Sequence, residues 1–109
     1  MSNIAMLYSF FAYNECDTDV EVSVSYFPPG ERDRWTSEIV HPGSRKLICI
    51  SDSQLFLSKA RSPPNDRYIW GAFEHTLTTS EHTHVFSCHC DWLNCPDKWS
   101  APCSRQEPD

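Results

Sequence analysis

The stretch that decides the fold is residues 20–26, V-E-V-S-V-S-Y, in which an apolar side chain occupies every second position. Successive side chains of a β-strand point to opposite faces, so this alternation predicts a strand with one buried face. Valine is β-branched, which favours the extended backbone of a strand. In a helix the same valines would be distributed around the whole circumference. Residues 20–26 are therefore expected to form a half-buried β-strand.

Short strand-like segments lie on both sides of this stretch. We expect them at residues 4–13, 35–41, 47–50, 55–57, 68–73, 75–79 and 82–86. Turn signals separate them, because proline cannot donate to a strand ladder and glycine accepts positive φ. About seven or eight short strands without a helical pattern are typical of antiparallel sandwiches. The sequence therefore predicts an all-β fold, a single antiparallel β-sandwich over residues 1–90.

The apolar pattern also predicts where individual strands lie. The run at 47–50 is expected in the centre of a sheet, and the shorter run at 55–57 is expected near an edge. Alternation along residues 68–73 places Trp70 and Phe73 on opposite faces. Two further strands are expected to pair as a hairpin around residues 79–80, which would place His75 opposite His84.

The C-terminal segment, residues 91–109, shows no apolar periodicity and contains three prolines and two tryptophans. We predict an irregular, cysteine-rich tail that packs on the same domain. Trp92 and Trp99 are candidates for a binding surface, because an irregular segment buries them less and tryptophan is enriched at recognition surfaces. The alternative is that they plug the core, as tryptophan does in many small β-domains.

The charge balance excludes some partners. The formal net charge is −6, and the basic residues are scattered along the chain. Nucleic acids and anionic membranes are bound through clustered lysine and arginine, so neither is expected as a partner. No apolar stretch approaches the roughly 20 residues that span a bilayer. We therefore expect a protein or a small ligand as partner and no membrane span.

The cellular compartment decides how the six cysteines are interpreted. The first 13 residues are apolar but lack the positive n-region and the cleavage site of a secretory signal, which predicts a cytoplasmic protein with reduced thiols. The cysteines would then be core residues or metal ligands. In the alternative, a secreted protein, the even number of cysteines allows up to three disulfides.

A cysteine cluster is the first candidate site. Cys88, Cys90 and Cys95 have the spacing C-x-C-x4-C, and Cys103 follows. Closely spaced thiolates bind Zn²⁺ tetrahedrally, so we predict a structural zinc site that fixes the tail. The spacing resembles the zinc-binding tail of SET-type methyltransferases, in which a fourth ligand comes from elsewhere. The resemblance is confined to residues 88–95 and implies ligand geometry, not activity. Free thiols and one or two disulfides are the alternatives.

A histidine cluster is the second candidate site. His75, His82 and His84 would share one face of the expected hairpin and could hold zinc, copper or iron. The H-x-H motif is similar to the metal motif of cupins, but the glycine before it and the glutamate after it are missing. The alternative is a row of exposed polar side chains on a solvent-facing strand.

Motifs of catalysis are missing from the chain. It has no G-x-S-x-G elbow and no P-loop, and its three glycines are too scattered for a phosphate-binding loop. The sequence therefore favours a small non-catalytic binding module, with zinc or disulfides fixing its tail. One alternative is a small metal-dependent enzyme that uses His75, His82 and His84. A second is a secreted, disulfide-stabilised, effector-like domain.

Overall fold

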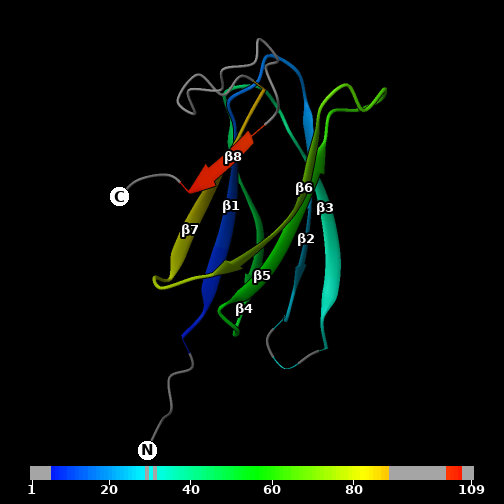
Figure 1. Ribbon diagram of the computed structural model, residues 1–109. Coiled ribbons are helices and arrows are strands. Elements are labelled where there is room, and N and C mark those ends of the chain that lie inside the picture. Colours follow the sequence, from blue (N-terminus) through cyan, green and yellow to red (C-terminus); the bar gives the residue numbers. More distant parts are fainter. Residues whose placement is uncertain (1–5, 29, 31, 89–102, 107–109) are drawn as a thin grey trace, which may run out of the picture.

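Two four-stranded β-sheets pack face to face in the computed structural model of the chain (Figure 1). The structure describes residues 6–28, 30, 32–88 and 103–106. Within these residues, all regular secondary structure is β-strand and no helix occurs. The predicted all-β sandwich is confirmed.

We call the two sheets sheet A and sheet B. Sheet A has the strand order β4-β1-β7-β8, and sheet B has the order β3-β2-β5-β6. The strands of sheet A are β1 (Tyr8–Asn14), β4 (Arg45–Ser51), β7 (Glu81–Ser87) and β8 (Cys103–Gln106). The strands of sheet B are β2 (Val20–Tyr26), β3 (Arg34–Val40), β5 (Leu55–Arg61) and β6 (Ile69–Thr76).

The core lies between the inner faces of the two sheets. The stretch that predicted the fold forms β2, and its three valines, Val20, Val22 and Val24, are fully buried. In β1 the inward positions include Phe10 and Ala12, which are also fully buried. Alternation with period two thus directs apolar side chains from both sheets into one core.

One pair of neighbours in sheet A, β1 and β7, is parallel, whereas the other pairs of described strands are antiparallel. The expectation of two purely antiparallel sheets is corrected in this respect. Phe10 lies beside His82, and Ala12 lies beside His84. Because parallel neighbours run in the same direction, the residues that follow β1 and β7 meet at the same end of the sheet.

Two strands lie where the apolar pattern did not predict them. β4 is an edge strand of sheet A, and β5 is a central strand of sheet B. β5 has seven residues and buries Phe56, Ser58 and Ala60 at alternate positions. Serine is mostly exposed in proteins, so Ser58 does not indicate a buried position. The pattern therefore detected only the start of this strand.

The hairpin expected around residues 79–80 does not form. β6 belongs to sheet B and β7 to sheet A, so residues 77–80 carry the chain from one sheet to the other (Figure 1). Leu77 fills the core at this crossing, and its N–H donates to the carbonyl of Gln54 at 3.0 Å. β6 and β7 therefore lie on opposite sides of the core.

A β-bulge in β6 changes which of its side chains point inward. The pairing with β5 shifts between Ser58 and Ala60, so Gly71 and Ala72 of β6 together oppose one residue of β5. The extra residue brings Trp70 and Phe73 to the same face, contrary to simple alternation. Trp70 is buried, and Phe73 borders the core from this edge strand with 51% of its surface exposed.

The C-terminal segment differs from the expected irregular tail in one place. Residues 103–106 form β8, which pairs antiparallel with β7 and extends sheet A. The other parts of the predicted tail, 91–102 and 107–109, lie outside the described residues. Within the described part of the chain, no helix has the length and apolarity needed to cross a membrane.

Candidate metal site between the sheets

Three buried histidines meet between the two sheets. β6 supplies His75 from sheet B, and β7 supplies His82 and His84 from sheet A. One ring nitrogen of each lies within 4.8 Å of those of the other two. Among the residues that the structure describes, no other group of three or more His, Cys, Asp or Glu side chains gathers its ligand atoms so closely.

The sequence predicted that these three histidines lie together, but it placed them on one face of a hairpin. The imidazoles do not share one hairpin face; they approach each other from two sheets across the core. His75, His82 and His84 are 4%, 8% and 1% exposed, respectively. The alternative interpretation, a row of exposed polar side chains on a solvent-facing strand, is therefore wrong.

Aromatic rings enclose the histidines. The centroid of the Phe10 ring lies 5.0 Å from that of His75 and 5.3 Å from that of His82. The centroid of the Phe73 ring lies 4.8 Å from that of His75 and 5.4 Å from that of His84. Phenyl rings offer no hydrogen-bonding groups of ordinary strength, so the surroundings of the imidazoles are largely apolar.

The hydrogen bonds of the cluster are incomplete. The Nε2 atom of His75 lies 2.7 Å from the hydroxyl oxygen of Ser58, which forms the next strand of sheet B. Neither ring nitrogen of His84 has a hydrogen-bond partner, although both atoms are buried. A buried polar atom without a partner costs about 1–3 kcal/mol of stability. Packing alone therefore does not account for a histidine at position 84.

Burial keeps His75 and His84 uncharged. The pKa of His75 and that of His84 are both lowered to about 3, chiefly because burial removes the rings from water. Repulsion by His84 and His82 lowers the pKa of His75 further, and repulsion by His82 does the same for His84. At neutral pH both rings are neutral, and each has a nitrogen lone pair. Neutral imidazole is the form that binds metals.

Buried charged side chains do not accompany the histidines in the part of the chain whose burial is described. Within residues 6–28, 30 and 32–88, no Asp, Glu, Lys or Arg is buried. Glu74 and Glu81 adjoin His75 and His82 in the sequence, but both are exposed. Adjacent residues of a strand point to opposite faces, so these carboxylates lie on the outer sides of their strands. The donors of the site are three imidazole nitrogens, none of which carries a negative charge.

The spacing of the nitrogens suits one metal ion after a small movement. Metal–nitrogen bonds of about 2.0–2.1 Å place three ligand atoms about 3.3–3.6 Å apart in tetrahedral or trigonal geometry. In the structure the separations are at most 4.8 Å. The nitrogens would therefore have to approach one another by at most about 1.5 Å to bind one ion.

β6, which carries His75, is the edge strand of sheet B. A pocket of about 200 Å³ opens beside β5 and β6, and His75 is one of its lining residues together with Phe56 and Glu74. Phe73 covers His75 and His84 from the same strand and is half exposed.

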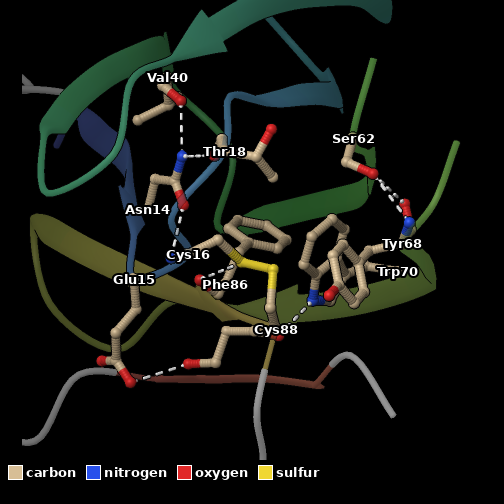
Figure 2. The surroundings of a disulfide bond; sticks show 11 residues. Asn14, Glu15, Cys16, Thr18, Val40, Ser62, Tyr68, Trp70, Phe86 and Cys88 are labelled. Atoms are coloured by element: carbon tan, nitrogen blue, oxygen red, sulfur yellow. Dashed lines mark hydrogen bonds between the residues drawn. A yellow bond between two sulfur atoms is a disulfide. The ribbon is translucent and has the colours of Figure 1, made fainter. Parts of the chain in front are cut away.

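The predicted cysteine site differs in the structure. Cys88 is joined to Cys16 by a disulfide bond, with the two Cα atoms 5.2 Å apart (Figure 2). It is therefore not available as a thiolate for the zinc site predicted with Cys90, Cys95 and Cys103. Cys90 and Cys95 lie outside the described residues, and Cys103 begins β8.

Hydrogen bonds support the disulfide at this end of the sandwich (Figure 2). The buried Asn14 accepts the N–H of Cys16 at 2.8 Å and donates to two backbone carbonyls, one of them that of Val40. The Nε1 atom of Trp70 donates to the carbonyl of Ser87 at 3.1 Å, which links the two sheets. The turn after β1 thus holds Cys16 beside the end of β7.

The other predicted residues have no place in the histidine site. Cys49 is a free, buried cysteine, and burial raises the pKa of its thiol to about 12. A thiol with so high a pKa is protonated at neutral pH and unreactive. Trp92 and Trp99, the predicted binding surface, lie outside the described residues. Ser58 was not predicted, because nothing in the sequence distinguishes it from other serines in strands.

Comparisons of the chain with protein-family models, with curated proteins and with solved structures find no match. Among the described residues, the histidine cluster is the feature that indicates a function. Three imidazoles are buried together, and one of them has no hydrogen-bond partner, a combination that a stable apolar core does not need.

Proposed function

We propose that the protein is a small, non-catalytic metal-binding module in which His75, His82 and His84 hold one transition-metal ion between the two sheets. The observation that carries this proposal is the convergence of three buried imidazole nitrogens within 4.8 Å. Imidazole is a good ligand for zinc, copper, nickel and iron. An ion bound there would provide a partner for one of the two His84 nitrogens, which have no hydrogen-bond partner in the protein.

Burial favours binding over catalysis. A metal enzyme keeps a coordination position open to a substrate. Here the most exposed of the three rings is 8% exposed, and Phe10 and Phe73 pack against the cluster. These contacts support a site that holds an ion, and they weigh against the alternative of a metal-dependent enzyme.

We also propose that the protein works in an oxidising environment, in place of the expected cytoplasmic one. The Cys16–Cys88 disulfide supports this, because glutathione and thioredoxin keep most thiols reduced in the cytosol. Intact mass of protein from its native source, alkylated without reduction, tests the proposal. Unmodified Cys16 and Cys88 are the expected result, and alkylation of both would contradict it.

The metal site is tested by titration of the full chain with Co²⁺ and Zn²⁺ after treatment with a chelator. Accessible thiols are first blocked with iodoacetamide, so that the tail cysteines do not compete. We expect one equivalent to bind, and we expect His84→Leu and His75→Leu to abolish this binding. His41→Leu is the matched control, because His41 is exposed and lies outside the cluster. Equal binding by His84→Leu and the parent protein would refute the proposal.

A further inference from the structure

We infer that the ion for which the histidine site is built is monovalent copper, Cu(I), rather than a divalent ion. The inference rests on the proposed function and deepens it. Three features of the site carry it: the absence of a counter-charge, the number of donors and the exclusion of water.

The first feature is charge. The three donors are imidazoles, which carry no negative charge, and no Asp or Glu is buried among the described residues. A bound ion would therefore keep its full charge inside an apolar core. The cost of moving an ion out of water grows with the square of its charge, so a divalent ion costs about four times as much as a monovalent ion of equal size. The apolar surroundings therefore favour a monovalent cation over a divalent one.

The second feature is the number and placement of the donors. Cu(II) favours a tetragonal arrangement of nitrogen and oxygen ligands. The cluster offers three nitrogens, with His75 on one sheet and His82 and His84 on the other. Cu(I) has a filled d shell and accepts two or three ligands without a preferred fourth. Three imidazoles that close around one point suit this ion.

The third feature is the exclusion of water. Zn²⁺ bound by three neutral histidines takes a water or hydroxide as fourth ligand. The hydroxyl of Ser58 lies 2.7 Å from the Nε2 atom of His75 and is a neutral group. Phe10 and Phe73 pack on the other sides. Zinc would therefore have to bring its own anion into an apolar space, whereas Cu(I) needs none. The copper is taken up already reduced, so no redox reaction on the protein is required.

The inference is tested by competition at pH 7.5. The full chain, with accessible thiols blocked by iodoacetamide, is mixed anaerobically with the coloured Cu(I) complex of bathocuproine disulfonate in the presence of ascorbate. Parallel titrations use Zn²⁺ and Co²⁺ with a divalent-metal indicator. We expect one equivalent of Cu(I) to leave the chelator, and a Kd at least about a hundredfold below that for Zn²⁺. His84→Leu should abolish the transfer, and His41→Leu should not change it.

The outcomes separate this inference from the function on which it rests. Histidine-dependent binding of Zn²⁺ or Co²⁺ that is tighter than that of Cu(I) overturns the choice of copper and leaves the metal-binding module intact. If neither Cu(I) nor a divalent ion binds in a histidine-dependent way, both the choice of copper and the proposed metal-binding function are overturned.

A measurement on the parent protein covers the case in which a variant fails to fold. X-ray absorption of the copper-loaded chain should show nitrogen neighbours at about 2.0 Å and no sulfur neighbours. Sulfur neighbours would assign the copper to cysteines and overturn the inference.

Discussion

At the scale of single residues, His84 is a buried side chain that lowers the stability of the metal-free protein. Its ring is 1% exposed, and neither nitrogen has a hydrogen-bond partner. Leucine has a similar volume and no polar atoms to satisfy. A residue that destabilises the metal-free protein is best explained by what it binds.

We predict that His84→Leu stabilises the metal-free protein by about 1 kcal/mol, because the substitution removes two unsatisfied polar atoms from the core. The gain is smaller than the cost of two such atoms, because the ring contacts of His84 with His75 and Phe86 are lost. Urea unfolding at pH 7.5 with a chelator measures the change. A loss of stability by a similar amount would mean that the imidazole is a structural element of the core.

The elements of the fold were predictable to different degrees. β2 was predicted with its bounds, because its valines alternate and no other pattern competes. The central role of β5 was missed, since its inward Ser58 is a poor signal of burial. The parallel pairing of β1 with β7 joins strands from opposite ends of the described chain, and a local pattern carries no information about such a partner.

The histidine site illustrates the same limit. The sequence indicated which three residues belong together, because H-x-H puts two of them on one face of a strand. It did not indicate that the third comes from the facing sheet, which depends on how residues 77–80 cross between the sheets. The partner of Cys88 was equally out of reach, since six cysteines allow fifteen complete pairings.

The bulge in β6 is the element that aligns the two inward-facing parts of that strand. Trp70 and His75 are five residues apart, so in a regular strand they would point to opposite faces, yet each is 4% exposed. We predict that deletion of Ala72 restores the alternation and forces one of the two side chains out of the core. The expected loss is about 3 kcal/mol, comparable to truncating a buried tryptophan.

Urea unfolding and the cobalt titration measure the two consequences of this deletion. Ala72→Ser, which keeps the chain length, is the control and should behave like the parent protein. An unchanged free energy of unfolding and unchanged metal binding in the deletion variant would show that the bulge has no role in positioning these side chains.

At the scale of the whole molecule, the disulfide joins the turn after β1 to the residue that follows β7. Cys16 and Cys88 are 72 residues apart in the sequence, so the bond closes a loop that contains most of the sandwich. Restriction of the unfolded chain by a loop of this length is worth about 4 kcal/mol in the chain-entropy model. For a domain of this size that is a large part of the total stability.

We predict that the double substitution Cys16→Ala and Cys88→Ala lowers the free energy of unfolding by about 4 kcal/mol. Cys49→Ala is the control; it removes a buried thiol outside the disulfide, with an expected cost of about 1 kcal/mol. Urea unfolding without reductant gives both values. Equal losses in the two variants would contradict a dominant contribution from the cross-link.

The stability of the whole molecule should also depend on pH through the buried histidines. The pKa of His75 and of His84 is about 3 in the folded protein and about 6.5 as a free side chain. Between these values the unfolded chain binds protons that the folded chain does not, so stability is full above about pH 6.5 and falls as the pH decreases. Each histidine contributes a slope of up to about 1.4 kcal/mol per pH unit.

We predict that the metal-free parent protein loses more stability between pH 7 and pH 4 than the variant His75→Leu/His84→Leu. The comparison between the two proteins cancels the contribution of carboxylates common to both. Chemical unfolding at several pH values provides the data. Parallel pH profiles would show that these two imidazoles are not held neutral by burial.

The most direct test of the central claim is native mass spectrometry of the full chain, alkylated without reduction and mixed in turn with one equivalent of Cu(I), Zn²⁺ or Co²⁺. The parent protein should retain the mass of one metal ion, and the variant His75→Leu/His82→Leu/His84→Leu should retain none while keeping its fold by circular dichroism. Retention of the same metal mass by both proteins would contradict a metal site between the sheets.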